Sequence, residues 1–365
     1  MTELDNIIND GFMLSETIKD DELDVAFTSL KIALISYFST YQDCTHQISS
    51  LANGYNNEAE EDSSYYNDYY RSCIETIIHF QHFFELSCKK ILKDEHPLLA
   101  DIASTNPVIL SKLLKGQKLQ NEEENSLRSI EFSEAIKRLI ALIKDKEITN
   151  HDKLEFIVKN KSILEGVNKL RNRIWHRGLF ILRYKSLDKL VCSFILPLVN
   201  DFINLDKISG YEIDWKYKSL HCGTDPIDEL IKEYKNSTPV NIKKIAFIKE
   251  LGRAAYNNPL IHKEITPSKR DFSAIFDNEK ITRAESITDI ITQHELSAVS
   301  DCPVCGVKSL ISYKEHDQEV DNNNFITRSD EYTYRIRCEC CGLSLENSFD
   351  NAKDYGLTGI KDLWY

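Results

Sequence analysis

The chain has 365 residues, of which 42% are hydrophobic, as expected for a globular protein of about two or three domains. Its formal net charge of −13 excludes a protein that coats polyanions through a general basic surface, because such binding depends on lysine and arginine neutralising phosphates. Any nucleic-acid site must therefore be local.

The first residues and the longest apolar segment predict an intracellular protein. Residues 1–10 are acidic and lack the basic region and apolar core of a secretory signal. The longest apolar segment, residues 190–203, is interrupted by Pro197 and Asp201 and is too short to span a bilayer. We therefore expect a cytoplasmic protein without a membrane span.

Residues 1–210 show apolar side chains recurring three and four positions apart, the pattern of amphipathic helices. Pro107 near the start of one short segment and Gly116 just after it have the positions expected at the two ends of a helix. The predicted helices cover residues 21–49, 64–92, 107–115, 132–144, 152–159, 162–177 and 187–203. This region is therefore predicted to be an all-α bundle.

The pattern changes twice after residue 210. Residues 211–299 are predicted to be a mostly helical connector, with helices at 227–235, 241–257 and 284–299. After Cys302 the periodicity becomes two in "SLISYKE" and "YTYRIRC", with the polar "HDQEVDNNN" between them as a hairpin-like connection. The predicted fold class is mainly α with a small β domain at 300–350, followed by a tail at 351–365.

Five of the ten cysteines lie close together near the C-terminus, in "CPVCG" and "CECCG". Two residues between cysteines let both thiolates of a tight turn face one ion, and two such turns supply four sulfurs for tetrahedral zinc. We expect structural zinc held by Cys302, Cys305, Cys338 and Cys341. The choice of Cys338 and Cys341 restores the two-residue spacing, which leaves Cys340 as a bystander or an alternative ligand.

The paired cysteines resemble the zinc-ribbon family over about residues 300–350. Ribbons of this type contact nucleic acid or protein partners, and Arg335 and Arg337 could serve either. A redox role would need only one Cys-x-x-Cys pair, and a catalytic zinc would need an open position that four thiolates close. The five scattered cysteines are interpreted as buried free thiols.

The segment "LRNRIWHRG", residues 170–178, gathers polar groups at the end of a predicted helix. Counting 100° per residue places Leu170 and Ile174 on the core stripe and His176 about opposite it, with Asn172 on nearly the same outer face. Arg171 stands at the border of the stripe. Residues 169–185 contain lysines and arginines but no acid, which makes a local basic face in an acidic protein.

The pattern Arg171-Asn172-x-x-x-His176 resembles the signature of the HEPN domain, a helical-bundle family with an arginine, often followed by asparagine, and a nearby histidine at a helix end. Residues 82–97 also resemble the early HEPN helix, and the resemblance covers about residues 63–206. It implies metal-independent RNA cleavage by a homodimer in which arginine and histidine of both protomers line one cleft. The chemistry suits the residues, since histidine can take the proton of the 2′-hydroxyl and arginine can stabilise the phosphorane-like transition state.

The resemblance implies an endoribonuclease, a toxin or an anti-phage defence effector, with Arg171, Asn172 and His176 catalytic and the ribbon docking a protein partner or trigger. On an ideal helix Arg171 and His176 are about 140° apart, which favours a composite site across a dimer or a helix that ends before His176. The alternative is a non-catalytic binding protein that docks a protein or nucleic-acid partner. The chain has no His-Glu-x-x-His and no P-loop, so neither zinc-dependent hydrolysis nor nucleotide use is indicated.

Overall fold

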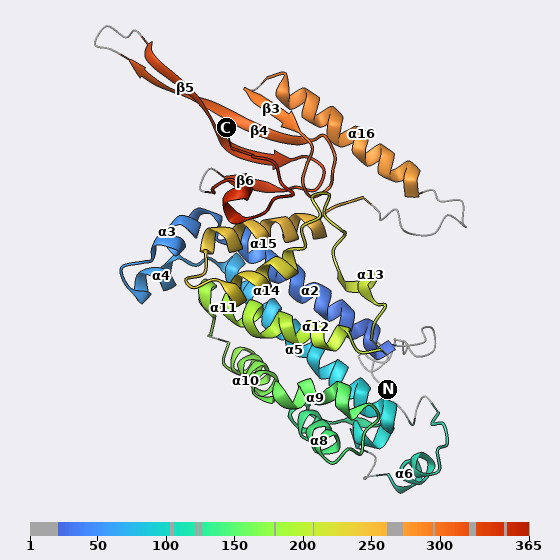
Figure 1. The fold of residues 1–365 in the computed structure, drawn as a ribbon. Coiled ribbons are helices and arrows are strands. Elements are labelled where there is room, and N and C mark those ends of the chain that lie inside the picture. Colours follow the sequence, from blue (N-terminus) through green and yellow to red (C-terminus); the bar gives the residue numbers. More distant parts are fainter. Residues whose placement is uncertain are drawn as a thin grey trace, which may run out of the picture. The chain divides into compact units, whose positions relative to one another are not determined.

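The computed structural model describes residues 21–102, 106–120, 123, 126–178, 180–206, 208–260, 273–294, 296–320, 326–346 and 349–364. Over these residues the protein is mainly α-helical, with a small antiparallel sheet near the C-terminus (Figure 1). The predicted fold class, mainly α with a small C-terminal β domain, is confirmed. None of the described helices is both long and apolar enough to cross a membrane.

The chain divides into two compact units, each assembled from segments that are distant in sequence. The first, which we call the helical unit, comprises Met1–Leu34, Ile74–Ile181 and Leu198–Trp215. The second, which we call the ribbon unit, comprises Ile35–Cys73, Leu182–Pro197 and Lys216–Tyr365. The domain boundaries expected at about residues 210, 300 and 350 stay predictions.

The helical unit is built from helices and one short two-stranded sheet. Its elements are the larger parts of α2 (Asp21–Asp43) and α5 (Asn67–Glu95), then η3 (Pro97–Leu99), β1 (Asp101–Ile102), α6 (Pro107–Leu114), β2 (Arg128–Ser129), α8 (Phe132–Lys144), α9 (His151–Lys159), α10 (Lys161–Arg177), the end of α12 (Leu196–Ile203) and α13 (Glu212–Trp215). Strands β1 and β2 pair antiparallel, with Asp101 opposite Ser129.

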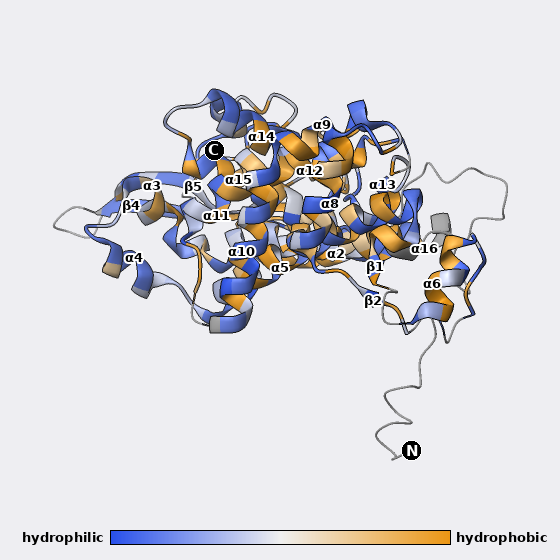
Figure 2. Ribbon diagram, turned by 90° about the horizontal axis from the view of Figure 1, so that it is seen from below, coloured by the Kyte–Doolittle hydropathy of each residue, from blue (hydrophilic) through white to orange (hydrophobic). Residues whose placement is uncertain are grey.

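Amphipathic helices account for the core of the helical unit. In α8 the buried side chains are Phe132, Ala135, Ile136, Leu139, Ile140 and Ile143, a spacing of three and four that covers one helix face. Helix α6 likewise shows both hydrophobic and hydrophilic colours in Figure 2. Its buried Ile109 and Leu113 pack against Leu98, Leu119 and Leu127 in a small cluster of their own. Burial of such faces supplies the main driving force for folding.

The ribbon unit combines short helices with a four-stranded sheet. Its elements are the end of α2, η2 (Thr45–Gln47), α3 (Ile48–Asn53), α4 (Glu58–Ser64), the start of α5, α11 (Tyr184–Leu190), the π-helical turn η4 (Val191–Ile195), the start of α12, α14 (Pro226–Asn236), α15 (Ile242–Tyr256), α16 (Ser273–Thr292), β3 (Ser297–Ser300), β4 (Leu310–Val320), β5 (Ile326–Cys338), β6 (Ser344–Glu346) and η5 (Ala352–Tyr355). The sheet has the order β3-β4-β5-β6 and is antiparallel throughout.

The centre of the ribbon unit holds a fully buried ion pair. Lys249 of α15 and Asp188 of α11 have no exposed side-chain surface, and Nζ lies 2.7 Å from Oδ1. The ammonium also lies 4.0 Å from the ring centre of Tyr184 and 4.6 Å from that of Tyr37. Burial raises the pKa of Asp188, and the positive charge of Lys249 opposes that rise. The Lys249 ammonium and the Asp188 carboxylate therefore stabilise each other's charged form in the core.

Most predicted helices lie close to their expected positions, but the helix expected at 21–49 is broken, because α2 ends at Asp43 and the short helices η2 and α3 follow it. The predicted helix at 284–299 was wrong at both ends, because α16 begins at Ser273 and ends at Thr292, and Ser297–Ser300 forms strand β3 instead. The expected helix at 187–203 is interrupted by the π-helical turn η4. Residues 316–320, expected in a hairpin connection, belong to β4, where the exposed polar side chains of residues 316–319 hide the strand pattern.

Candidate functional site

The four cysteine sulfurs chosen from their spacing lie together in the ribbon unit. All Sγ atoms of Cys302, Cys305, Cys338 and Cys341 are within 4.8 Å of one another. Two of the separations, Cys302 to Cys341 and Cys305 to Cys338, are 3.6 Å. Zinc–sulfur bonds of about 2.3 Å in a tetrahedron place sulfurs about 3.8 Å apart, so this donor set fits a structural zinc ion. Cys340 lies outside the set.

The backbone of the two Cys-x-x-Cys turns follows one pattern. The N–H of Gly306 donates to the carbonyl of Cys302 at 2.8 Å, and the N–H of Gly342 donates to that of Cys338 at 3.0 Å. Both glycines have positive φ, 75° and 71°, a conformation that other residues adopt only with strain. The N–H of Cys340 points at the Cys338 sulfur at 3.4 Å, which is the kind of contact that stabilises a thiolate ligand.

The first cysteine turn is braced by the segment that precedes α14. The N–H of His221 donates to the carbonyl of Val304 at 3.0 Å, and that of Cys222 donates to the carbonyl of Pro303 at 2.8 Å. A Cβ on Gly306 would lie 2.7 Å from Nδ1 of His221, so only glycine allows this close packing. The first cysteine turn is therefore packed against the rest of the ribbon unit.

The second cysteine turn is held by α15. Arg253 binds Glu250 through two hydrogen bonds of 2.6 Å and also donates to the carbonyl of Gly342. Glu250 accepts the N–H of Ser344 at 2.6 Å. Glu250 is fully buried and Arg253 is 7% exposed, so this charged pair connects the metal site to the core of the unit.

Helix α10 presents the second candidate site, in the helical unit. Val167 and Ile174 are buried and hold the helix against its neighbours. The helix runs unbroken through residues 171–177 and ends at Gly178, whose φ of 65° and N–H bond to the carbonyl of Ile174 form a left-handed cap. A helix that ends before His176 is therefore excluded. Arg171 and His176 of one chain are about 140° apart around this helix.

Arg171 contacts two uncharged side chains of its own helix. Its Nη1 donates to Oδ1 of Asn172 at 3.0 Å, and its guanidinium lies 5.6 Å from the ring centre of Trp175. Its Nε is buried and finds no acceptor among the described residues. Within that part of the chain no carboxylate pairs with Arg171, so its charge is available for an anionic ligand. His176 is exposed.

Helix α5 carries two histidines that sequence reasoning did not single out, and one of them, His82, interacts electrostatically with Arg171. His79 and His82 are one helical turn apart, and Nδ1 of His82 lies 2.8 Å from Oγ of Ser29. Burial lowers the pKa of both. For His82 the charge of Glu85 opposes this effect, whereas His79, Lys89 and, least of the three, Arg171 add to it. The signal available in the sequence was the His-x-x-His spacing on one face of a long predicted helix.

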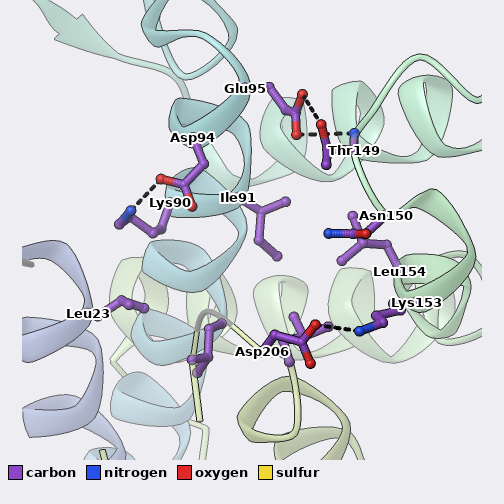
Figure 3. Close-up of a pocket in the computed structure, with 12 residues that line it drawn as sticks. Leu23, Lys90, Ile91, Asp94, Glu95, Thr149, Asn150, Lys153, Leu154 and Asp206 are labelled. Atoms are coloured by element: carbon purple, nitrogen blue, oxygen red, sulfur yellow. Dashed lines mark hydrogen bonds and ion pairs between the residues drawn. The ribbon is translucent and has the colours of Figure 1, made fainter. Parts of the chain in front are cut away.

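A small pocket lies elsewhere in the helical unit, between α2, α5, α9 and the segment after α12 (Figure 3). Its volume of about 60 Å³ is far below that of a typical ligand pocket. Its charged side chains already have partners: Lys90 pairs with Asp94, Lys153 pairs with Asp206, and Glu95 accepts hydrogen bonds from Thr149. None of the predicted site residues lines it.

Comparison with known proteins gives no relative from which a function could be transferred. The chain matches no family model, no curated protein and no solved structure.

Proposed function

We propose that this protein is an endoribonuclease of the HEPN type that cleaves RNA without a catalytic metal, at a site composed of two α10 helices. The observation that carries the proposal is the state of Arg171, a cation held by Asn172 and Trp175 with no carboxylate partner in the described part of the chain. A guanidinium in this setting suits a phosphate, which it can bind with paired donors. The exposed His176 lies on the same helix, one residue before its end.

The proposed reaction needs only a base, an acid and a charge stabiliser. A histidine imidazole takes the proton of the ribose 2′-hydroxyl, whose oxygen then attacks the adjacent phosphorus. The bond from phosphorus to the 5′-oxygen breaks, and an imidazolium returns a proton to that leaving oxygen. The products are a 2′,3′-cyclic phosphate and a free 5′-hydroxyl. Arg171 stabilises the negative charge on the phosphorane-like transition state, and Asn172 orients the Arg171 guanidinium.

A second copy of the chain supplies what one copy lacks. Because α10 is continuous, Arg171 and His176 of one chain point in different directions and cannot both reach one phosphate. In a two-fold pair, Arg171 of one protomer would face His176 of the other. We therefore propose a homodimer as the active form, with RNA as substrate.

The four-cysteine cluster would hold zinc as a structural ion. Four thiolates leave no open coordination position, so zinc would stabilise the ribbon unit and supply no step of the cleavage. In this proposal the ribbon unit binds a protein partner or the molecule that triggers activity. A role as a toxin or anti-phage effector in the cytoplasm rests on the HEPN resemblance.

The test is cleavage of labelled single-stranded RNA by the full chain in EDTA, with the zinc content of the protein measured after the incubation. The native chain is expected to cut and to leave a 2′,3′-cyclic phosphate, and His176→Ala and Arg171→Ala to lose the activity. His294→Ala, an exposed histidine after α16, is the matched control and should retain it. A substrate with 2′-deoxyribose at the cleaved nucleotide should resist cutting.

Two results would overturn the proposal. Equal cleavage by the native chain and His176→Ala would show a contaminating nuclease or a different site. Tight binding of a folded partner without cleavage of transfer, ribosomal or messenger RNA would favour the alternative, a non-catalytic binding protein.

A further inference from the structure

Trp175 is the most unusual side chain near the proposed RNA site. It lies on the last turns of α10 with 62% of its surface exposed, although the indole is the largest side chain and gains most from burial. The Arg171 guanidinium sits over its ring at 5.6 Å, which orients the indole beside the proposed phosphate ligand.

The cation beside Trp175 is Arg171, one helical turn before it, which pairs with no carboxylate among the described residues. Lys169 and Arg173 also have no carboxylate partner in that part of the chain, but they lie about 120° and 160° from Trp175 around α10. Arg173 instead stacks on Phe180, with 3.5 Å between its guanidinium carbon and the ring centre. A cation beside an exposed aromatic ring is a combination that proteins use for single-stranded nucleic acid, where a phosphate meets the cation and a base stacks on the ring.

We propose that Trp175 stacks on an unpaired base beside the bound phosphate, which makes this site selective for single-stranded RNA over duplex RNA. The inference rests on the proposed RNA site, because Arg171 supplies both the phosphate contact and the orientation of the indole. In an RNA duplex the bases are stacked inside a helix whose deep groove excludes side chains, so the indole finds no free base face there.

The experiment measures binding apart from cleavage. Fluorescein-labelled 2′-O-methyl RNA, which lacks the attacking hydroxyl, is titrated with the full chain as a single strand and as a duplex. Trp175→Ala is expected to weaken single-strand binding about 5- to 150-fold and to leave duplex binding unchanged. Trp175→Phe, which keeps an aromatic face, should recover most of the lost affinity. Phe276→Ala removes an exposed aromatic of α16 and is the matched control.

The outcomes separate this inference from the proposed function. Unchanged single-strand affinity in Trp175→Ala overturns the inference, as does a native chain that prefers the duplex. A loss of dimer mass in Trp175→Ala with unchanged RNA affinity also overturns it and assigns the indole to a contact between protomers. Tryptophan-dependent binding without cleavage of unmodified RNA supports the inference and overturns the ribonuclease, whereas cleavage without tryptophan dependence does the reverse.

Discussion

Replacing Lys249 by methionine tests how the ribbon unit tolerates a charge in its core. The substitution keeps the length of the side chain but leaves the carboxylate of Asp188 without the ammonium 2.7 Å away, at a position with no solvent exposure. Removing one partner of a buried ion pair costs about 3–5 kcal/mol. For a unit of this size each kcal/mol lowers the midpoint of thermal unfolding by about 2–4 °C, so a fall of about 6–20 °C is expected.

The loss of unfolding free energy in Lys249→Met should depend on pH in a direction set by the pKa of Asp188. Burial raises the pKa of Asp188 above its ordinary value of 3.8, so the folded protein binds a proton more readily than the unfolded chain. Stability therefore falls as pH rises from that value through the folded pKa, and removal of Lys249 raises the folded pKa further. We expect the loss of unfolding free energy to be larger at pH 8 than at pH 5.

The assay is urea unfolding followed by circular dichroism, with two further variants. Lys249→Met combined with Asp188→Leu removes both charges and should recover most of the lost stability. Lys232→Met breaks the exposed pair with Glu229 on α14 and should cost less than about 1 kcal/mol. A double variant no more stable than Lys249→Met, or a loss that is independent of pH, would refute the reasoning.

Three other predictions concern the metal site, its support and RNA affinity. Removal of the metal should lower the midpoint of thermal unfolding by about 10 °C or more, because structural zinc contributes folding free energy. Calorimetry with and without a chelator that competes with the cysteines for the metal measures this change. An unchanged midpoint would show that the cysteines hold no structural ion. Arg253→Met leaves Glu250 buried without its charged partner and should cost about 3–5 kcal/mol in urea unfolding. Because burial raises the pKa of Glu250, that cost should grow from pH 5 to pH 8, and a constant cost would contradict it. Lys169→Gln should reduce the slope of log affinity for single-stranded RNA against log salt by about 0.7, measured by anisotropy at several KCl concentrations, and an equal slope would mean that Lys169 contacts no phosphate.

The four-cysteine cluster could be predicted almost completely from the sequence. The spacing of "CPVCG" and "CECCG" carries the geometry of each turn, so Cys302, Cys305, Cys338 and Cys341 could be named without a structure. The side chains that support it could not be predicted, because Arg253 and Glu250 lie far from the cysteines in the sequence and resemble ordinary charged residues of an amphipathic helix. Their burial appears only when α15 packs beside the second turn.

The proposed RNA site was partly visible in the sequence. Helical counting placed Ile174 inside and His176 outside, and the structure agrees on both. The contact of Arg171 with Trp175 depends on side-chain rotamers, and its influence on His82 depends on α5, a separate helix, so neither follows from the local sequence. Strand β3 was missed because four residues carry too few alternations to compete with the helical pattern before them.

The central claim is that Arg171 of one protomer works with His176 of another, and a mixing experiment tests it most directly. Arg171→Ala and His176→Ala are each inactive in the account, but a mixed dimer retains one Arg171 facing one His176. After subunit exchange, verified by native mass spectrometry, the mixture is expected to cleave RNA while each variant alone does not. Mixed dimers that form and stay inactive would contradict the composite site.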